Sequence, residues 1–163
     1  MNTGSKSRNT GPCGAAFLLA QLGAHAAGRF GERVARIGLS PPDAGLMKKI
    51  ASDPGISQQT LADHLGVVPS RMVALIDNLE HKRLVERVSS AEDRRMYALR
   101  LTAKGQQTLG EIGKIALEHE RDLLAALTDT ERATLADLCA RIANQQGLIP
   151  GVHPGYRQLG NKP

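Results

Sequence analysis

The stretch that most constrains this chain covers residues 56–105, where two short helical patterns are followed by two strand-like segments. Ser57 is a good N-cap for the first helix, and Gly66 can take the left-handed turn that ends it. The second helix is predicted over residues 69–82. It begins with Pro69, which is tolerated at the first helical position because that N–H would lack a partner in any case. The pattern therefore predicts two helices joined by a tight turn.

The second of these helices is amphipathic. Apolar residues recur in it at three- and four-residue steps, which predicts one buried face. That face consists of Met72, Leu75, Ile76 and Leu79. The opposite face consists of Ser70, Arg71, Ala74, Asp77 and Asn78. One side of the helix is thus suited to a core, and the other is free to contact a partner.

A hairpin is predicted directly after this helix, because residues 85–88 and 97–101 alternate between apolar and polar side chains. The connecting segment, SSAEDRRM, is too polar for a core and too charged for a tight turn. Helix, turn, helix and basic hairpin in this order are typical of a winged helix-turn-helix.

The residue types at the start of the second helix suit DNA. A helix N-terminus offers free N–H groups and a partial positive charge to phosphate. The small residues Pro69 and Ser70, with Ala74 on the same side, let the helix enter the major groove. Arg71 can then reach a guanine edge or a phosphate. The alternative is an ordinary surface helix.

Further contacts to DNA are predicted on both flanks of this helix. Ser57 and Gln58 are candidates for phosphate contacts at the start of the first helix. Arg94 and Arg95 stand at the hairpin tip, where a narrow minor groove attracts guanidinium groups. Asp93 is expected to pair with an arginine and to shape the wing. The alternative is that these charges only keep the loop soluble.

The segment LADHLGVVPSRMVALIDNLEHKRLVERVSSAEDRRMYALRLTAKG resembles the DNA-binding domain of the MarR family of bacterial transcriptional regulators. The most specific pieces are LVER, DRR followed by ALRLT, and the K-G after it. With the flanking helices, the resemblance covers residues 14–146. Arg83 stands where the family usually has the glycine that closes the recognition helix, so a glycine cap is not expected there. Lys82 and Arg87 are expected to be solvated charges.

The resemblance implies a mainly α protein, a winged helix-turn-helix whose long terminal helices form an intertwined homodimer. Such a dimer would read a palindromic operator in double-stranded DNA. We expect a sequence-specific transcriptional regulator, a repressor relieved by a small-molecule effector. The expected parts are a disordered tail (1–12), a helical dimerisation region (13–38 and 102–146), the DNA-binding domain (39–101) and a C-terminal tail (147–163). The C-terminal tail is predicted to be either disordered or packed over a neighbour.

Composition supports a polyanionic partner and argues against an enzyme. The formal net charge is +5, and only 2% of the residues are aromatic, which disfavours nucleic-acid platforms built on stacking. No nucleophile–base pair, carboxylate dyad, metal cluster or phosphate loop is evident, so neither cofactor nor metal is predicted. No apolar run is long enough for a membrane span, and no clean signal peptide is present, so a cytoplasmic protein is expected.

Two regulatory hypotheses concern the terminal helices. His25, Phe30 and Met47 are weak candidates for an effector pocket, for which a small aromatic or apolar acid is expected; the alternative is core packing. Cys13 lies near the place where one branch of the family carries a peroxide-sensing cysteine. That branch surrounds the thiol with tyrosine hydroxyls, which this chain lacks nearby, so Cys13 is expected to be incidental. The remaining alternatives are a peroxide sensor acting through Cys13 and a helical interaction module without DNA binding.

Overall fold

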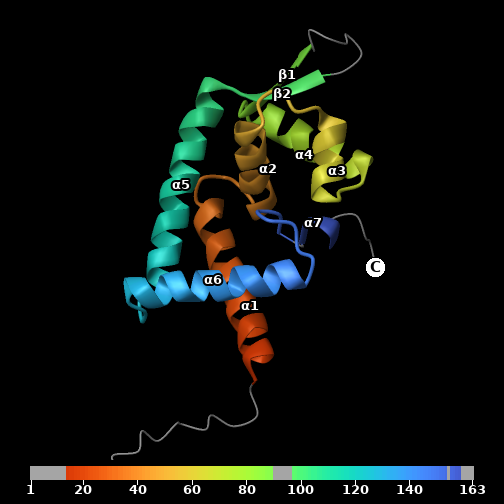
Figure 1. Ribbon diagram of the computed structural model, residues 1–163. Helices are drawn as coiled ribbons and strands as arrows, with labels where there is room; N and C mark the ends of the chain where they lie inside the picture. Colours follow the sequence, from red (N-terminus) through yellow and green to blue (C-terminus); the bar gives the residue numbers. More distant parts are fainter. Residues whose placement is uncertain (1–13, 90–96, 154, 159–163) are drawn as a thin grey trace, which may run out of the picture.

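The computed structural model describes residues 14–89, 97–153 and 155–158. Its elements are α1 (Ala15–Ala35), α2 (Pro41–Ser52), α3 (Gln58–Leu65), α4 (Pro69–His81), β1 (Val85–Ser89), β2 (Tyr97–Leu101), α5 (Ala103–Leu123), α6 (Asp129–Gln145) and α7 (Gly155–Gln158). Figure 1 shows α2, α3, α4 and the hairpin gathered at one end of the molecule and α1 and α6 at the other, with α5 running from the hairpin down to α6. The expected mainly α winged helix-turn-helix is confirmed.

Side-chain caps set where the helices begin. Ser40 accepts a hydrogen bond from the N–H of Asp43, and the Asp43 carboxylate accepts one from the N–H of Ser40 at 3.0 Å, which completes a capping box. Ser57 caps α3 in the predicted way, and its Oγ accepts from the N–H of Thr60 at 3.0 Å. Gly66 ends α3 with a φ of 64°, the left-handed conformation that favours glycine. The two helices of the helix-turn-helix are therefore defined locally.

The core lies under α2, α3, α4 and the hairpin. The four apolar residues predicted for α4 are all buried, which confirms the orientation of that helix. They pack in one cluster with side chains from the neighbouring elements, among them Leu46, Met47, Ile50, Leu61, Val85 and Leu99. Burying a large apolar side chain contributes about 1.5–3 kcal/mol, so this cluster fixes which face of α4 looks outward.

The hairpin is antiparallel, and its register pairs Val85 with Leu101 and Arg87 with Leu99. The segment before α3 joins the sheet, because the N–H of Leu99 donates to the carbonyl oxygen of Ile56 at 3.0 Å. Side chains alternate along a strand, so Arg87 shares a face of β1 with the buried Val85. The wing is thereby attached to the start of α3 as well as to the end of α4.

Arg83 closes the recognition helix in the conformation that a glycine would take. Its φ is 59°, and its N–H donates to the carbonyl oxygen of Glu80 at 2.8 Å. A left-handed conformation costs a non-glycine residue about 1–2 kcal/mol. The turn is held nonetheless, because Thr102 Oγ1 donates to the carbonyl oxygen of Arg83 at 2.7 Å.

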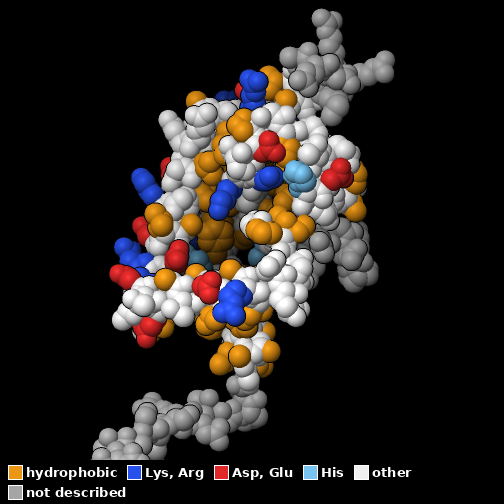
Figure 2. All heavy atoms as spheres, viewed as in Figure 1, with side chains coloured by type: hydrophobic (Ala, Val, Ile, Leu, Met, Phe, Trp, Pro, Cys, Tyr) orange, Lys and Arg blue, Asp and Glu red, His pale blue; other side chains and the backbone are white. Residues whose placement is uncertain are grey.

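The long helices leave apolar side chains uncovered. Within the described residues, α6 has no buried residue, and its Leu138 and Ile142 are 46% and 48% exposed. On α1, Phe17 and Leu22 are more than half exposed. Figure 2 shows hydrophobic side chains gathered where α1 projects past α6. No helix among residues 14–89, 97–153 and 155–158 is long and apolar enough to cross a membrane.

The C-terminal segment folds back onto α2 of the same chain. Tyr156, from the short helix α7, is 7% exposed, and its hydroxyl donates to the carbonyl oxygen of Pro42 at 2.8 Å. Burial, and then the nearby Asp43 carboxylate, raise the pKa of Tyr156. The ring lies over Gly45, where an added Cβ would meet the Tyr156 hydroxyl oxygen at 2.1 Å. Tyr156 therefore packs against α2 of its own chain, and the prediction for the tail as a whole stays a prediction.

We predict that Gly45→Ala releases Tyr156 and lowers the free energy of unfolding by about 1 kcal/mol. Alanine gains about 1 kcal/mol of helix propensity, but losing the buried ring costs roughly 2 kcal/mol. Denaturant unfolding of the variant measures the balance. In a Tyr156→Ala background the same exchange should instead stabilise the protein. An equal effect in both backgrounds would contradict the packing of Tyr156 on Gly45.

Candidate nucleic-acid interface

The outward face of α4 carries the residues that the sequence predicted for it. Pro69, Ser70, Arg71 and Ala74 are all exposed. Val68, the N-cap, makes no side-chain cap, Pro69 has no N–H, and the N–H of Arg71 donates to the carbonyl oxygen of Val68, so among the described residues the first turn leaves the N–H of Ser70 without a partner. Free N–H groups and a partial positive charge at a helix N-terminus favour an anion such as phosphate.

The start of α3 is linked to this face through the hairpin. Ser57 Oγ is engaged in capping and lies 2.8 Å from Thr60 Oγ1. Gln58 is half-buried, and its amide oxygen accepts two hydrogen bonds from Arg87 of β1, at 3.0 and 3.3 Å. The side chains of both predicted phosphate-binding residues therefore make internal hydrogen bonds: that of Ser57 within α3, and that of Gln58 with Arg87 of the wing.

Arg87 differs from the solvated charge that was expected. Its side chain is only 20% exposed and forms ion pairs with Asp77 at 2.6 Å and with Glu80 at 2.5 Å, both on α4. The sequence contained a signal for this, because alternation along β1 places Arg87 on the face of the buried Val85. The guanidinium thus joins β1, α3 and α4.

Lys82 also differs from the solvated charge that was expected. Its ammonium group lies 3.1 Å from a carboxylate oxygen of Asp43, whose side chain is 3% exposed. It also donates to the carbonyl oxygen of Gly38 at 3.0 Å. Asn78 of α4 donates to the other carboxylate oxygen of Asp43 at 3.3 Å. The C-terminal end of α4 is therefore fixed to the start of α2.

The predicted residues of the hairpin tip, Asp93, Arg94 and Arg95, lie outside the described residues. Cys13 lies outside them too. Cys139 on α6 is half-buried and carries a free thiol.

The three effector candidates are not brought together. His25 lines a cavity of about 240 Å³ between α1 and α5. Met47 has no exposed surface and belongs to the core, and Phe30 packs at the edge of that core with its ring 5.7 Å from the His119 ring. The cavity is lined by His25, Arg29, Arg33, His119, Asp122 and Leu123.

The cavity between α1 and α5 is rich in cations. Arg33 lies 2.5 Å from Asp122, and Arg29 lies 3.4 Å from Glu32. Burial, and then Arg33 and Arg29, lower the pKa of His119. Both arginines are thus paired with carboxylates, and Asp122 itself lines the cavity, so a bound anion would meet charges of both signs there.

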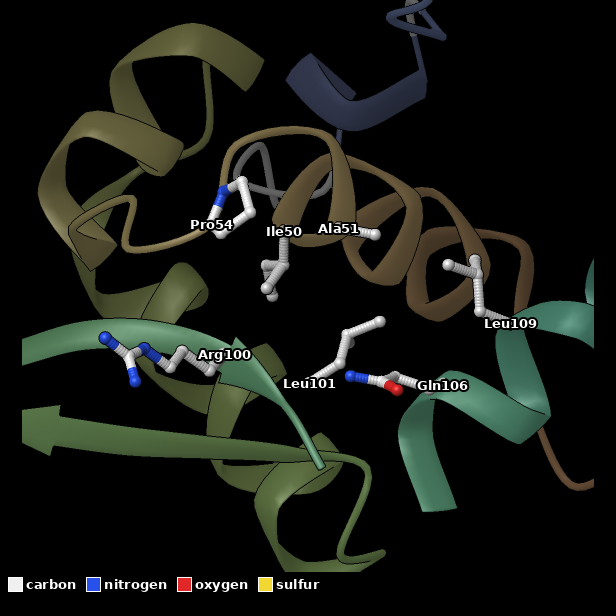
Figure 3. A pocket seen from close by; sticks show the side chains of 7 residues that line it. All are labelled: Ile50, Ala51, Pro54, Arg100, Leu101, Gln106 and Leu109. Carbon is white, nitrogen blue, oxygen red and sulfur yellow. The ribbon is translucent and has the colours of Figure 1, made fainter. Parts of the chain in front are cut away.

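A second cavity, of about 360 Å³, lies where α2, β2 and the start of α5 meet. Figure 3 shows the guanidinium of Arg100 pointing away from the other side chains, whereas Leu101 and Gln106 lie beneath Ile50. This cavity therefore offers no cation to an acid, only apolar walls and one amide. Within the described parts of the chain, no three His, Cys, Asp or Glu side chains are grouped so that they could hold a metal ion.

Comparisons with known proteins agree with this geometry. A model of the MarR family matches residues 37–96. A Thauera aromatica protein assigned to transcriptional regulation of the hcr operon is 37% identical over 113 residues, which cover 69% of this chain and 68% of that protein. The structure of the transcriptional repressor CouR bound to a 23-mer DNA duplex is 32% identical, with a TM-score of 0.71, and the match covers 79% of this chain and 92% of CouR.

The fold itself recurs at lower identity. Wild-type MarR from E. coli is 20% identical, with a TM-score of 0.69, and the match covers 80% of this chain and 98% of that one. Together with the exposed face of α4, these similarities show that the chain belongs to the MarR family and is a DNA-binding transcriptional regulator rather than an enzyme.

Proposed function

We propose that the protein is a homodimeric repressor that binds a palindromic operator and is released from it by a small acid. The observation that carries the dimer is the uncovered apolar surface of α1 and α6, which includes Phe17, Leu22, Leu138 and Ile142. Contiguous exposed apolar surface of this kind marks protein interfaces. The similarity to CouR, described as a transcriptional repressor, supports repression.

In this proposal each protomer places α4 in one major groove. Pro69, Ser70 and Ala74 allow close approach, and Arg71 reads a base edge. Ser57 and Gln58 contact the phosphate backbone from the start of α3. Arg94 and Arg95 extend the contact into the minor groove, and Asp93 shapes the wing.

The proposed effector is a small aromatic or apolar carboxylic acid. The cavity between α1 and α5 supports this, because His25, Arg29 and His119 line it and its pocket wall also includes the apolar Leu123. α1, which forms one wall of the cavity, also carries part of the uncovered surface described above. A ligand that binds there would therefore alter the distance between the two recognition helices of a dimer.

We expect Leu22→Arg to give a monomer, because a charge would be buried in the dimer interface. Losing the second half-site contact should lower operator affinity about a hundredfold. Sedimentation equilibrium and titration of the DNA upstream of the protein's own reading frame measure the two effects. Gln107→Arg adds the same charge at an exposed position of α5 and should leave the oligomeric state and the operator affinity unchanged. A parent protein that sediments as a monomer would sink the dimer proposal.

Arg71→Ala should reduce sequence preference. If Arg71 reads a base, its loss costs about 1–3 kcal/mol on the operator and much less on random duplex. Fluorescence anisotropy with both duplexes gives the difference, and Arg121→Ala, an exposed arginine of α5, is the control. An equal loss on both duplexes would show that Arg71 touches only phosphate.

Benzoate should release the operator, and it should bind more tightly at about pH 6 than at about pH 8. The pKa of His119 is lowered in the free protein, and a bound carboxylate raises it. His119 therefore takes up a proton when the acid binds, and this coupling strengthens binding at the lower pH. Calorimetry at both pH values tests this. Arg29→Met should abolish binding, whereas Arg36→Met, at the exposed arginine that follows α1 outside the cavity, should not. Unchanged benzoate affinity in Arg29→Met would show that the effector binds at another site.

A further inference from the structure

Arg87 occupies an unusual position for a cation in a DNA-binding domain. It lies behind the proposed DNA-binding surface, with its guanidinium bonded to Asp77, Glu80 and Gln58. Its own backbone N–H also donates to a carboxylate oxygen of Glu80, at 3.3 Å. These bonds occupy its Nε, Nη1 and Nη2 groups, so Arg87 is committed to protein partners.

The first consequence concerns the side chain of Gln58. A guanidinium has only donors, so it binds the amide oxygen of a glutamine and not the amide nitrogen. Two N–H groups of Arg87 hold that oxygen. The oxygen and nitrogen of a carboxamide lie on opposite sides of the group, so the NH₂ of Gln58 is directed away from Arg87. Gln58 is the first residue of α3, a position from which its NH₂ group can donate a hydrogen bond to a DNA phosphate.

The second consequence concerns charge. Asp77 and Glu80 belong to α4, and their side chains are 57% and 41% exposed. Two uncompensated carboxylates on the recognition helix would repel the phosphates of an approaching duplex. The guanidinium lies 2.6 and 2.5 Å from them and offsets this repulsion.

We propose that Arg87 is a positioning residue for DNA recognition: it directs the amide donor of Gln58 toward the DNA and offsets part of the negative charge of the two carboxylates of α4, without contacting the DNA itself. This inference rests on the proposed function, in which the start of α3 and the outer face of α4 meet the duplex. The wing then has a second role in DNA recognition, which is carried by Arg87 at the base of the hairpin and not by the residues at its tip.

The first experiment is operator titration by Arg87→Met over a range of salt concentrations. Operator affinity should fall about tenfold, as expected for a coupled network, and in an Asp77→Asn/Glu80→Gln background, where no carboxylate is left uncompensated, Arg87→Met should leave the slope of log K against log salt unchanged. A direct phosphate contact would instead flatten that slope by about 0.9 and overturn the proposal. Arg100→Met is the matched control. Arg100 is exposed and pairs with Glu86 in the register, on the other face of the hairpin from Arg87, so its loss should not produce the tenfold effect.

The second experiment is a double-mutant cycle. Gln58→Ala should weaken operator binding in the parent and have little further effect in Arg87→Met, because Gln58 then lacks its orienting partner. Adding Asp77→Asn and Glu80→Gln to Arg87→Met should recover part of the affinity by removing the uncompensated charge. Additive effects of Gln58 and Arg87, together with no recovery, would overturn the proposal.

One further variant and one comparison between variants keep the test decisive. If Arg87→Met does not fold, Arg87→Lys keeps the charge but loses the fork that holds Gln58, so it should show the same insensitivity to Gln58→Ala. Full parental coupling in Arg87→Lys would contradict the orienting role. If Gln58→Ala and Arg71→Ala both bind as the parent does, the proposed DNA face is itself wrong. If they weaken binding while Arg87→Met does not, only the role of Arg87 fails.

Discussion

A buried carboxylate, that of Asp43, is the constraint on which the geometry of the recognition helix depends. It caps α2, accepts a hydrogen bond from Asn78 and pairs with Lys82. Removing one partner of a buried ion pair is strongly destabilising, because the remaining charge is left unpaired. The segment that carries Asp43 is covered in turn by Tyr156. The end of α4 therefore cannot shift without disturbing α2 and the C-terminal segment.

Arg87 restrains the outer side of α4, as Asp43 restrains the C-terminal end of that helix. The apolar residues of α4 determine which face is buried, but a core of aliphatic side chains tolerates small rotations and shifts. Ion pairs to Asp77 and Glu80, and the bond to Gln58, add directional restraints. A rigid support of this kind suits a surface that must match the groove of DNA to within a fraction of an ångström.

Much of this fold could be predicted from the sequence, because its signals are local. The caps at Ser40 and Ser57, the turn at Gly66 and the apolar face of α4 depend on neighbouring residues alone. The partners of Lys82 and Arg87 could not be predicted, because they are tens of residues away or on another element, although the alternation along β1 indicated that Arg87 faces the buried side. The left-handed conformation of Arg83 could not be predicted for a similar reason. The hydrogen bond that offsets its energetic cost comes from Thr102, which is distant in the sequence. The predicted residues of the site on α3 and α4 stay predictions until DNA binding is measured.

Hydrogen exchange of the protein with and without its operator tests the central claim, that the supported outer face of α3 and α4 reads DNA. The account predicts slower amide exchange over residues 57–60 and 69–74 when the operator is bound, because the first turns of both helices then lie against phosphate and base edges. Exchange in the core-facing turns of α2 should be slow in both states. Protection confined to α5 and α6, with the first turns of α3 and α4 unchanged, would contradict the account.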